Sequence, residues 1–77
     1  MIISSLILKC LVGFEEQIRG PLANIKGLSI ETVLEGQLIL VLESPSVESV
    51  LQIMDEQILK LQGVIGVYPV YIHYETA

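Results

Sequence analysis

The strongest constraint on the fold is an internal repetition of one short plan. The segment Leu6-Ile7-Leu8 recurs as Leu38-Ile39-Leu40, and the pair Gly27-Leu28 recurs as Gly63-Val64. Each apolar segment has the character of a buried strand, and each glycine is a suitable end for a helix that precedes a further strand. The sequence therefore predicts two strand–helix–strand units in tandem, in the order βαββαβ.

The first unit begins with a strand over about Ile3–Val12, whose continuous apolar run suits a central position in a sheet. The helix that follows contains Gly20-Pro21, and proline at that place is expected to kink the helix or delay its start. Four apolar residues of this helix have helical spacing: Phe14, Ile18, Leu22 and Ile25. One face of the helix is therefore expected to cover the sheet.

Strands over about Leu28–Val33 and Gln37–Glu43 are expected to form a hairpin. Their apolar faces coincide if the loop is Leu34-Glu35-Gly36, because a two-residue turn would place Glu31 in the core. Gly36 supplies the left-handed conformation that the last position of a three-residue loop requires. This register directs three residues of the first hairpin strand toward the core: Leu28, Ile30 and Thr32.

The second helix is predicted to begin at Ser46, a good N-cap residue, and to end at Gly63. Its apolar stripe consists of Val47, Val50, Leu51, Met54, Ile58 and Leu61. The last strand, over about Val64–Tyr74, contains Pro69, and proline within a sheet is found mainly on edge strands.

Right-handed crossovers in both units give an antiparallel sheet in the order 4-1-3-2, with both helices on one face. This is a ferredoxin-like α+β fold, and a length of 77 residues suits one domain over residues 1–77. The continuous apolar runs then lie in the two central strands, and the strand with Pro69 lies at an edge.

No segment of the sequence is left to cover the second face of this sheet. Alternation of side chains directs Ser5, Lys9, Ser29 and Glu31 to that face, together with six apolar residues: Ile7, Ile39, Val41, Tyr68, Val70 and Ile72. A contiguous apolar patch of this kind usually marks a binding surface. The alternative is a homodimer that buries one sheet against another.

Acidic residues are expected to gather at one end of the same face. Glu15 and Glu16 follow the first strand, Glu43 ends the third, and Glu31 lies on its neighbour. We expect the ends of these strands to meet at one edge, where the acids would guide a cationic partner or form an ordinary charged rim. A formal net charge of −5 argues against nucleic acid as that partner.

Residues with catalytic or metal-binding chemistry are scarce. The single cysteine, Cys10, has inward parity in a central strand, and the single histidine, His73, lies on another strand. No metal site, cofactor site or catalytic pair is therefore predicted, and the chain is not expected to be an enzyme. The apolar N-terminal run is too short to span a bilayer and has no basic segment before it, so a cytoplasmic location is expected.

Several segments together resemble the NapD family. They are Ser5-Leu6-Ile7-Leu8, the stretch Gly36-Gln37-Leu38-Ile39-Leu40-Val41-Leu42-Glu43, Gly63-Val64-Ile65-Gly66-Val67 and Val70-Tyr71. The resemblance covers nearly the whole chain. It departs at Gly20-Pro21 and in a hairpin loop that is shorter than in the family.

The resemblance implies a ferredoxin-like cytoplasmic chaperone without a cofactor. Such proteins bind the twin-arginine signal peptide of NapA, the catalytic subunit of the periplasmic nitrate reductase, and delay its export until its cofactors are loaded. The implied peptide-binding residues are those of the uncovered face: Ser5, Ile7, Lys9, Glu31, Ile39, Val41, Glu43, Tyr68, Val70 and Ile72. A ligand-sensing ACT-like domain that dimerises through the sheet, and a structural subunit, remain the alternatives.

Overall fold

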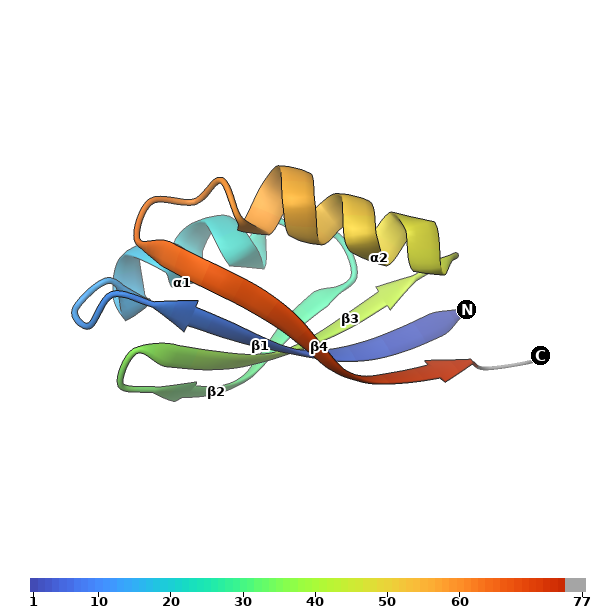
Figure 1. Cartoon of the computed structure of the whole chain (residues 1–77), viewed down its shortest axis with the longest axis horizontal. Helices are drawn as coiled ribbons and strands as arrows, with labels where there is room; N and C mark the ends of the chain where they lie inside the picture. Colours follow the sequence, from blue (N-terminus) through green and yellow to red (C-terminus); the bar gives the residue numbers. More distant parts are fainter. Residues whose placement is uncertain (75–77) are drawn as a thin grey trace.

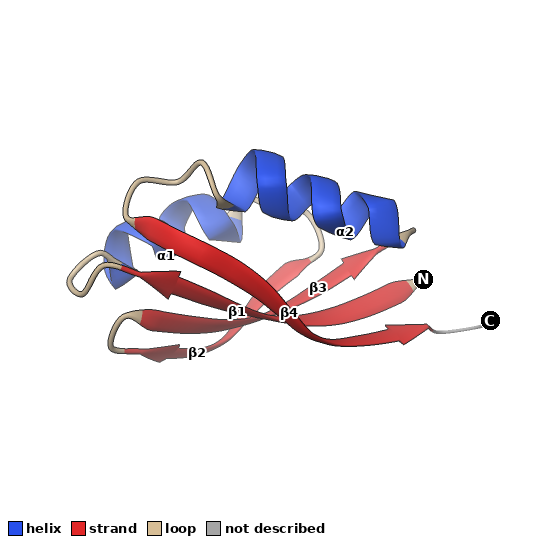
Figure 2. Ribbon diagram, in the orientation of Figure 1, coloured by secondary structure: helices blue, strands red, loops and turns tan. Residues whose placement is uncertain are grey.

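The computed structural model describes residues 1–74, so the last three residues of the predicted domain lie outside the described part. Within it, four strands form one antiparallel sheet in the order β2-β3-β1-β4, and the helices lie on one side of it (Figures 1 and 2). The predicted ferredoxin-like fold is confirmed. The elements are β1 (Ile2–Cys10), α1 (Glu15–Ala23), β2 (Leu28–Leu34), β3 (Gln37–Ser44), α2 (Val47–Ile53), the π-helical η1 (Met54–Ile58) and β4 (Val64–Tyr74).

The core lies between the sheet and the helices. Five leucines of the two central strands have no exposed surface: Leu6, Leu8, Leu38, Leu40 and Leu42. Ile18 and Leu22 of α1 and Val50 of α2 pack into the same cluster. Each fully buried side chain of this size contributes about 1.5–3 kcal/mol of hydrophobic free energy, so the leucines stabilise the layered arrangement.

Helix α2 begins where the sequence predicts. Ser46 caps α2, since its Oγ accepts a hydrogen bond from the Ser49 N–H at 3.1 Å. Helix α1 starts at Glu15 and retains Pro21 in its last turn, so the proline does not delay the start of the helix. Within residues 1–74, no helix has the length and apolar character needed to cross a membrane.

The β2–β3 hairpin differs from the prediction in its loop and in its register. Leu34 pairs with Gln37, so the turn contains only Glu35 and Gly36, with Gly36 at a φ of 72°. A bulge at Glu31 returns the β2 side chains to the faces that match those of β3. Ile30 pairs with Leu40, whereas Thr32 pairs with Ile39. The extra residue of the bulge keeps Glu31 out of the core despite the short turn.

The consequence for β2 is that the prediction for Thr32 is wrong. Val33 pairs with the buried Leu38 and packs against the core, whereas Thr32 is exposed. The inward positions of Leu28 and Ile30 are confirmed.

Strand β4 is an edge strand, as predicted from Pro69, and it contains two irregularities. Leu6 pairs with Pro69 and Ser5 pairs with Tyr71, so Val70 is an extra residue between them. Proline has no N–H to donate, which suits it to a bulge at an edge. Beyond this bulge every side chain lies on the face opposite to the one that simple alternation predicts.

Candidate functional site

The side of the sheet without helices is called the open face here (Figure 2). The strand register shows which residues belong to it. Along each strand, every second residue faces the helices, as the buried leucines do, and the residues between them lie on the open face. The open face consists of Ile3, Ser5, Ile7 and Lys9 of β1; Ser29, Thr32 and Leu34 of β2; Gln37, Ile39, Val41 and Glu43 of β3; and Gly66, Tyr68, Tyr71 and His73 of β4.

An apolar row crosses the middle of the open face. Ile7 pairs with Ile39 on one side and with Tyr68 on the other. The adjacent row holds Val41, Ser5 and Tyr71 in the same relation. Directly opposed side chains in a sheet have Cβ atoms about 4.5–5.5 Å apart, so these residues form one continuous surface. The isoleucines and Val41 are half-buried, and the two tyrosines are more than half exposed.

The ring of Tyr68 can lie close to the surface of the sheet because Gly66 has no side chain. A β-carbon added at Gly66 would lie 2.5 Å from Tyr68 Oη, so the tyrosine ring covers the glycine two residues before it. Covering a strand glycine with an aromatic ring fills the gap in the pleated surface.

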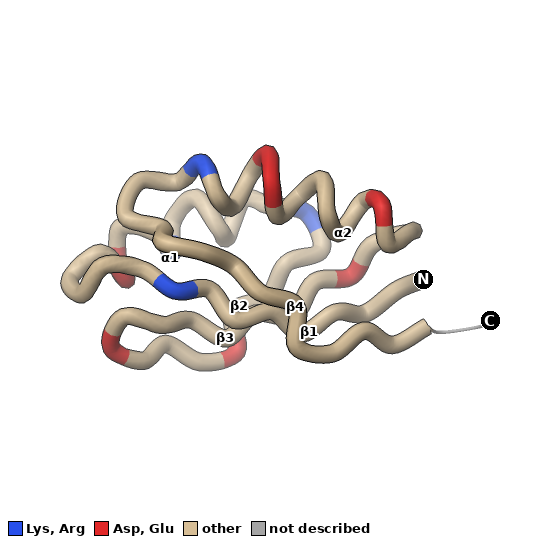
Figure 3. The backbone as a smooth tube through the Cα atoms, viewed as in Figure 1, with Lys and Arg blue, Asp and Glu red and all other residues tan. Residues whose placement is uncertain are grey.

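The two ends of the open face carry different charges. At one end Lys9 pairs with Gln37 and Gly66, and at the other end Ile3 pairs with Glu43 and His73. Because β1 and β3 are antiparallel, the C-terminal end of one lies beside the N-terminal end of the other. The prediction that Glu43 and Glu15 meet at one edge is therefore wrong. Acidic residues occur along the whole molecule rather than in one corner (Figure 3).

Glu15 has a structural role instead. Its Oε1 accepts a hydrogen bond from Gly13 N–H at 3.0 Å, and its Oε2 accepts one from Gly36 N–H at 2.6 Å. The bond from Gly36 is the main reason that the pKa of this carboxyl lies below its ordinary value. Glu15 thus ties the loop after β1 to the β2–β3 turn. Glu16 instead forms an exposed ion pair with Arg19 at 3.3 Å.

Most of the predicted binding residues lie on the open face. These are Ser5, Ile7, Lys9, Ile39, Val41, Glu43 and Tyr68. Glu31 is the exposed bulge residue beside Thr32, at the edge of the same surface. Val70 is likewise an exposed bulge residue, without a partner in the register of β1. Ile72 is wrongly placed by the prediction, since it pairs with the buried Ser4 on the helix side.

Eight members of the open face are absent from the predicted binding set: Ile3, Ser29, Thr32, Leu34, Gln37, Gly66, Tyr71 and His73. Tyr71 and His73 form a stacked pair, with ring centroids 6.2 Å apart and an interplanar angle of 8°. Tyr71 Oη lies 3.3 Å from His73 Nδ1. The sequence signal for these two residues was Pro69, because a bulge at the proline reverses the parity that follows it.

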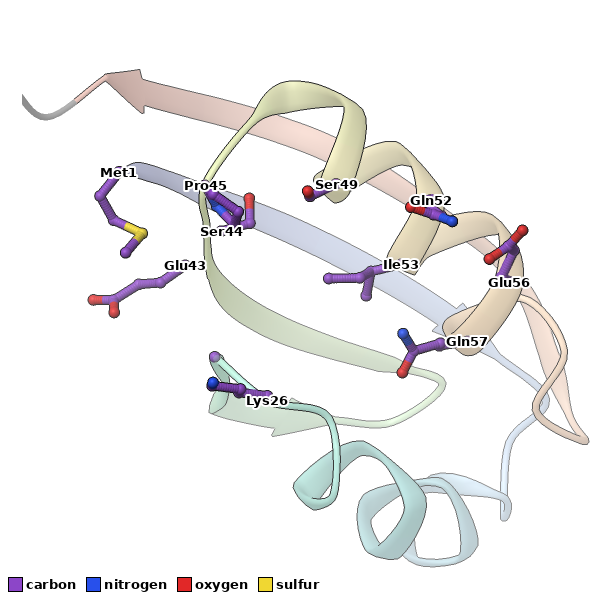
Figure 4. Close-up of a pocket in the computed structure, with 11 residues that line it drawn as sticks. Met1, Lys26, Glu43, Ser44, Pro45, Ser49, Gln52, Ile53, Glu56 and Gln57 are labelled. Carbon is purple, nitrogen blue, oxygen red and sulfur yellow. The ribbon is translucent and has the colours of Figure 1, made fainter.

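A concave surface lies on the helix side of the sheet. It is a groove of about 670 Å³ between α2 and the loop that precedes β2, and Figure 4 shows its lining side chains. Lys26, Gln52 and Gln57 contribute polar groups there.

The described residues contain no cluster of three or more potential metal ligands. Burial, and to a lesser degree the charge of Glu15, raise the pKa of Cys10 above its ordinary value.

Comparison with known proteins gives one family and one solved structure. The family model described as "NapD protein" matches residues 1–76. The solution structure of the E. coli Tat proofreading chaperone protein NapD superimposes with a TM-score of 0.80 at 26% sequence identity, over 96% of this chain and 78% of that one. None of the curated proteins matches the sequence of this chain.

Proposed function

The chain belongs to the NapD family, and we propose that it is a chaperone of twin-arginine signal peptides that binds the leader of the NapA nitrate reductase precursor on its open face. The similar solved structure is that of a Tat proofreading chaperone, which supports the general role. In this proposal residues 1–77 act as one domain in the cytoplasm and delay export of the precursor until its cofactors are loaded.

The observation that carries the proposal is the uncovered apolar row on the sheet. Ile7, Ile39 and Tyr68 lie side by side across three strands, and no helix of the described chain packs over them. An apolar surface left open in this way is typical of a docking site. The row suits an amphipathic helix whose apolar side lies against the sheet.

The mode of action needs no chemistry from the chain. A twin-arginine signal peptide has a basic start and an apolar continuation, and both parts would be covered while it lies on the open face. A bound leader is hidden from the export machinery, so release is a competition and the affinity must be finite. The net charge of −5, with Glu31 at the edge of the open face and Glu43 at one of its ends, favours a basic ligand.

A homodimer that buries the same face, as in ligand-sensing regulatory domains, is the competing use of this surface. A small-molecule sensor would need polar groups that converge in a pocket. The open face instead presents side chains spread over four strands. The peptide proposal therefore accounts better for the character of the surface.

The test is calorimetric titration of the purified chain with a synthetic NapA leader peptide. We expect saturable binding by the unaltered chain and none by Val41→Asp, because the bound state would bury an unpaired carboxylate. The matched control is Leu51→Asp, since Leu51 lies on α2 and is 54% exposed, contrary to its predicted place in the apolar stripe of that helix. The control is expected to bind like the unaltered chain.

Three results would contradict the proposal. One is the absence of binding by the unaltered chain. Another is equal binding by a folded Val41→Asp variant, which would place the peptide elsewhere. The third is a stable dimer in analytical ultracentrifugation that Val41→Asp dissociates and that the peptide does not disturb, since the face would then serve self-association.

A further inference from the structure

Given the proposed function, on which this inference rests, we infer that the Glu43 end of the open face is the subsite for the arginine side chains of the bound peptide. The guanidinium groups stack on Tyr71 and form ion pairs with the Glu43 carboxylate. The inference also fixes the direction in which the peptide lies on the sheet, with its basic start at this end and its apolar continuation toward Lys9.

The strand register brings the required groups together. Ile3 lies between Glu43 on β3 and His73 on β4, and Tyr71 occupies the next row beside Ser5. Since neighbouring strands are about 4.8 Å apart, the backbones of Glu43 and His73 are about 10 Å apart across β1. Two adjacent arginines, with long side chains, can reach an aromatic group on one side of this gap and a carboxylate on the other.

Tyr71 is arranged as a platform for a planar cation. Its side chain is 58% exposed on the open face. The parallel imidazole of His73, with centroids 6.2 Å away, and the 3.3 Å contact between Tyr71 Oη and His73 Nδ1 support one orientation of the phenol ring. Guanidinium groups stack on aromatic faces, whereas the compact ammonium group of lysine offers no plane to stack. The subsite therefore selects arginine over lysine.

The opposite end of the open face repels the same ligand groups. Lys9 lies beside Gln37, six positions before Glu43 along β3, which corresponds to about 20 Å at the usual rise of a strand. A peptide bound in the reverse direction would bring its arginines to Lys9 and leave Glu43 without a partner. In the direction inferred here, the apolar residues of the peptide cover Ile7 and Ile39 between the two charged ends.

The experiment compares two synthetic leader peptides that differ only in an Arg-Arg or a Lys-Lys pair. Affinities are measured calorimetrically for the unaltered chain, Tyr71→Leu and Glu43→Gln. We expect the unaltered chain to prefer the arginine peptide. Tyr71→Leu is expected to weaken binding of that peptide by about 2- to 5-fold, the range for an exposed cation–π contact, with a smaller effect on the lysine peptide. Glu43→Gln should weaken both peptides, because both carry the charge.

The matched controls lie on the other side of the sheet or on a helix. Tyr74→Leu alters a tyrosine of the same strand that is 65% exposed and pairs with Ile2 on the helix side. Glu48→Gln removes an exposed carboxylate from α2. Both controls are expected to leave the affinities of the two peptides unchanged.

The direction of the peptide has its own measurement. A spin label at the N-terminal, basic end of the peptide is expected to broaden the amide resonances of Tyr71, His73 and Glu43 and to leave those of Lys9 and Gly66 sharp. Broadening at Lys9 instead, or an unchanged arginine preference in Tyr71→Leu, would overturn the subsite while leaving peptide binding intact. Failure of the unaltered chain to bind either peptide would overturn the proposed function as well.

Discussion

The two faces of the sheet are built from the same strands yet have different side chains. Positions that face the helices are mainly leucine, and Leu6, Leu8 and Leu40 have no exposed surface. The apolar side chains that the two central strands direct to the open face are isoleucine and valine, which remain half-buried. Leucine fills the space between a sheet and helices, whereas stiff β-branched side chains form a pleated surface without needing a second layer. Alternate residues of one strand therefore either stabilise the core or form the proposed binding surface.

The largest expected effect tests that division at two neighbouring residues. Leu40→Ala is expected to lower the free energy of unfolding by about 2–5 kcal/mol, because it leaves a cavity in the core. Ile39→Ala, one position away on the open face, should cost clearly less and reduce peptide affinity instead. Urea denaturation of both variants makes the comparison. Equal losses of stability would mean that the two faces do not differ in the way described.

A smaller effect tests the bulge in β2. Val33→Ala is expected to destabilise the fold by about 1 kcal/mol, since it removes methyl groups that pack against the core. Thr32→Ala should leave stability nearly unchanged, because Thr32 is exposed opposite Ile39. Thermal unfolding of the pair decides the register. If Thr32→Ala destabilised the fold more than Val33→Ala, Thr32 would face the core and the hairpin would have the three-residue loop expected from the sequence.

The pH dependence of stability distinguishes Glu15, which joins two loops at one end of the sheet, from its exposed neighbour Glu16. The pKa of Glu15 is lowered from 4.5 in the folded state, chiefly by the Gly36 N–H. Its contribution is therefore complete above the unfolded pKa and is lost as the pH falls through the lower folded value. Glu15→Gln should remove this acidic part of the stability profile. Glu16→Gln, at the next residue, should retain it in denaturation measured from neutral to acidic pH.

The smallest effect concerns charges at the edges of the open face. Glu31→Gln combined with Glu43→Gln is expected to slow association with the leader peptide at low salt and to weaken its salt dependence, because screening acts mainly on electrostatic steering. Exposed ion pairs contribute only about 0–1 kcal/mol each, so dissociation should change little. Stopped-flow mixing at several salt concentrations measures both rates. Rates identical to those of the unaltered chain would mean that Glu31 and Glu43 are ordinary solvated charges that do not steer the peptide.

The repeated plan was enough to predict the order of elements, the buried leucines and the edge position of β4. The errors arose where a strand gains a residue. The bulges at Glu31 and Val70 reverse the parity downstream of them, so alternation misplaced Thr32 and Ile72 and omitted Tyr71. Pro69 is a residue type found at bulges, whereas no proline or glycine lies beside Glu31 to mark the bulge in β2. The error in the expected cluster of acidic residues has another cause. Because β1 and β3 are antiparallel, Glu43 and Glu15 lie at opposite ends of the sheet.

The irregular outer strands of the sheet have a consequence for the behaviour of the chain at high concentration. β2 and β4 are the strands with free backbone edges, and both depart from regular pairing, β4 also through Pro69. Straight, regular edges recruit strands from other molecules and begin fibril growth. Bulges and proline interrupt that route at both sides of the sheet. The chain can thus present a broad apolar surface without offering its backbone as a template for aggregation.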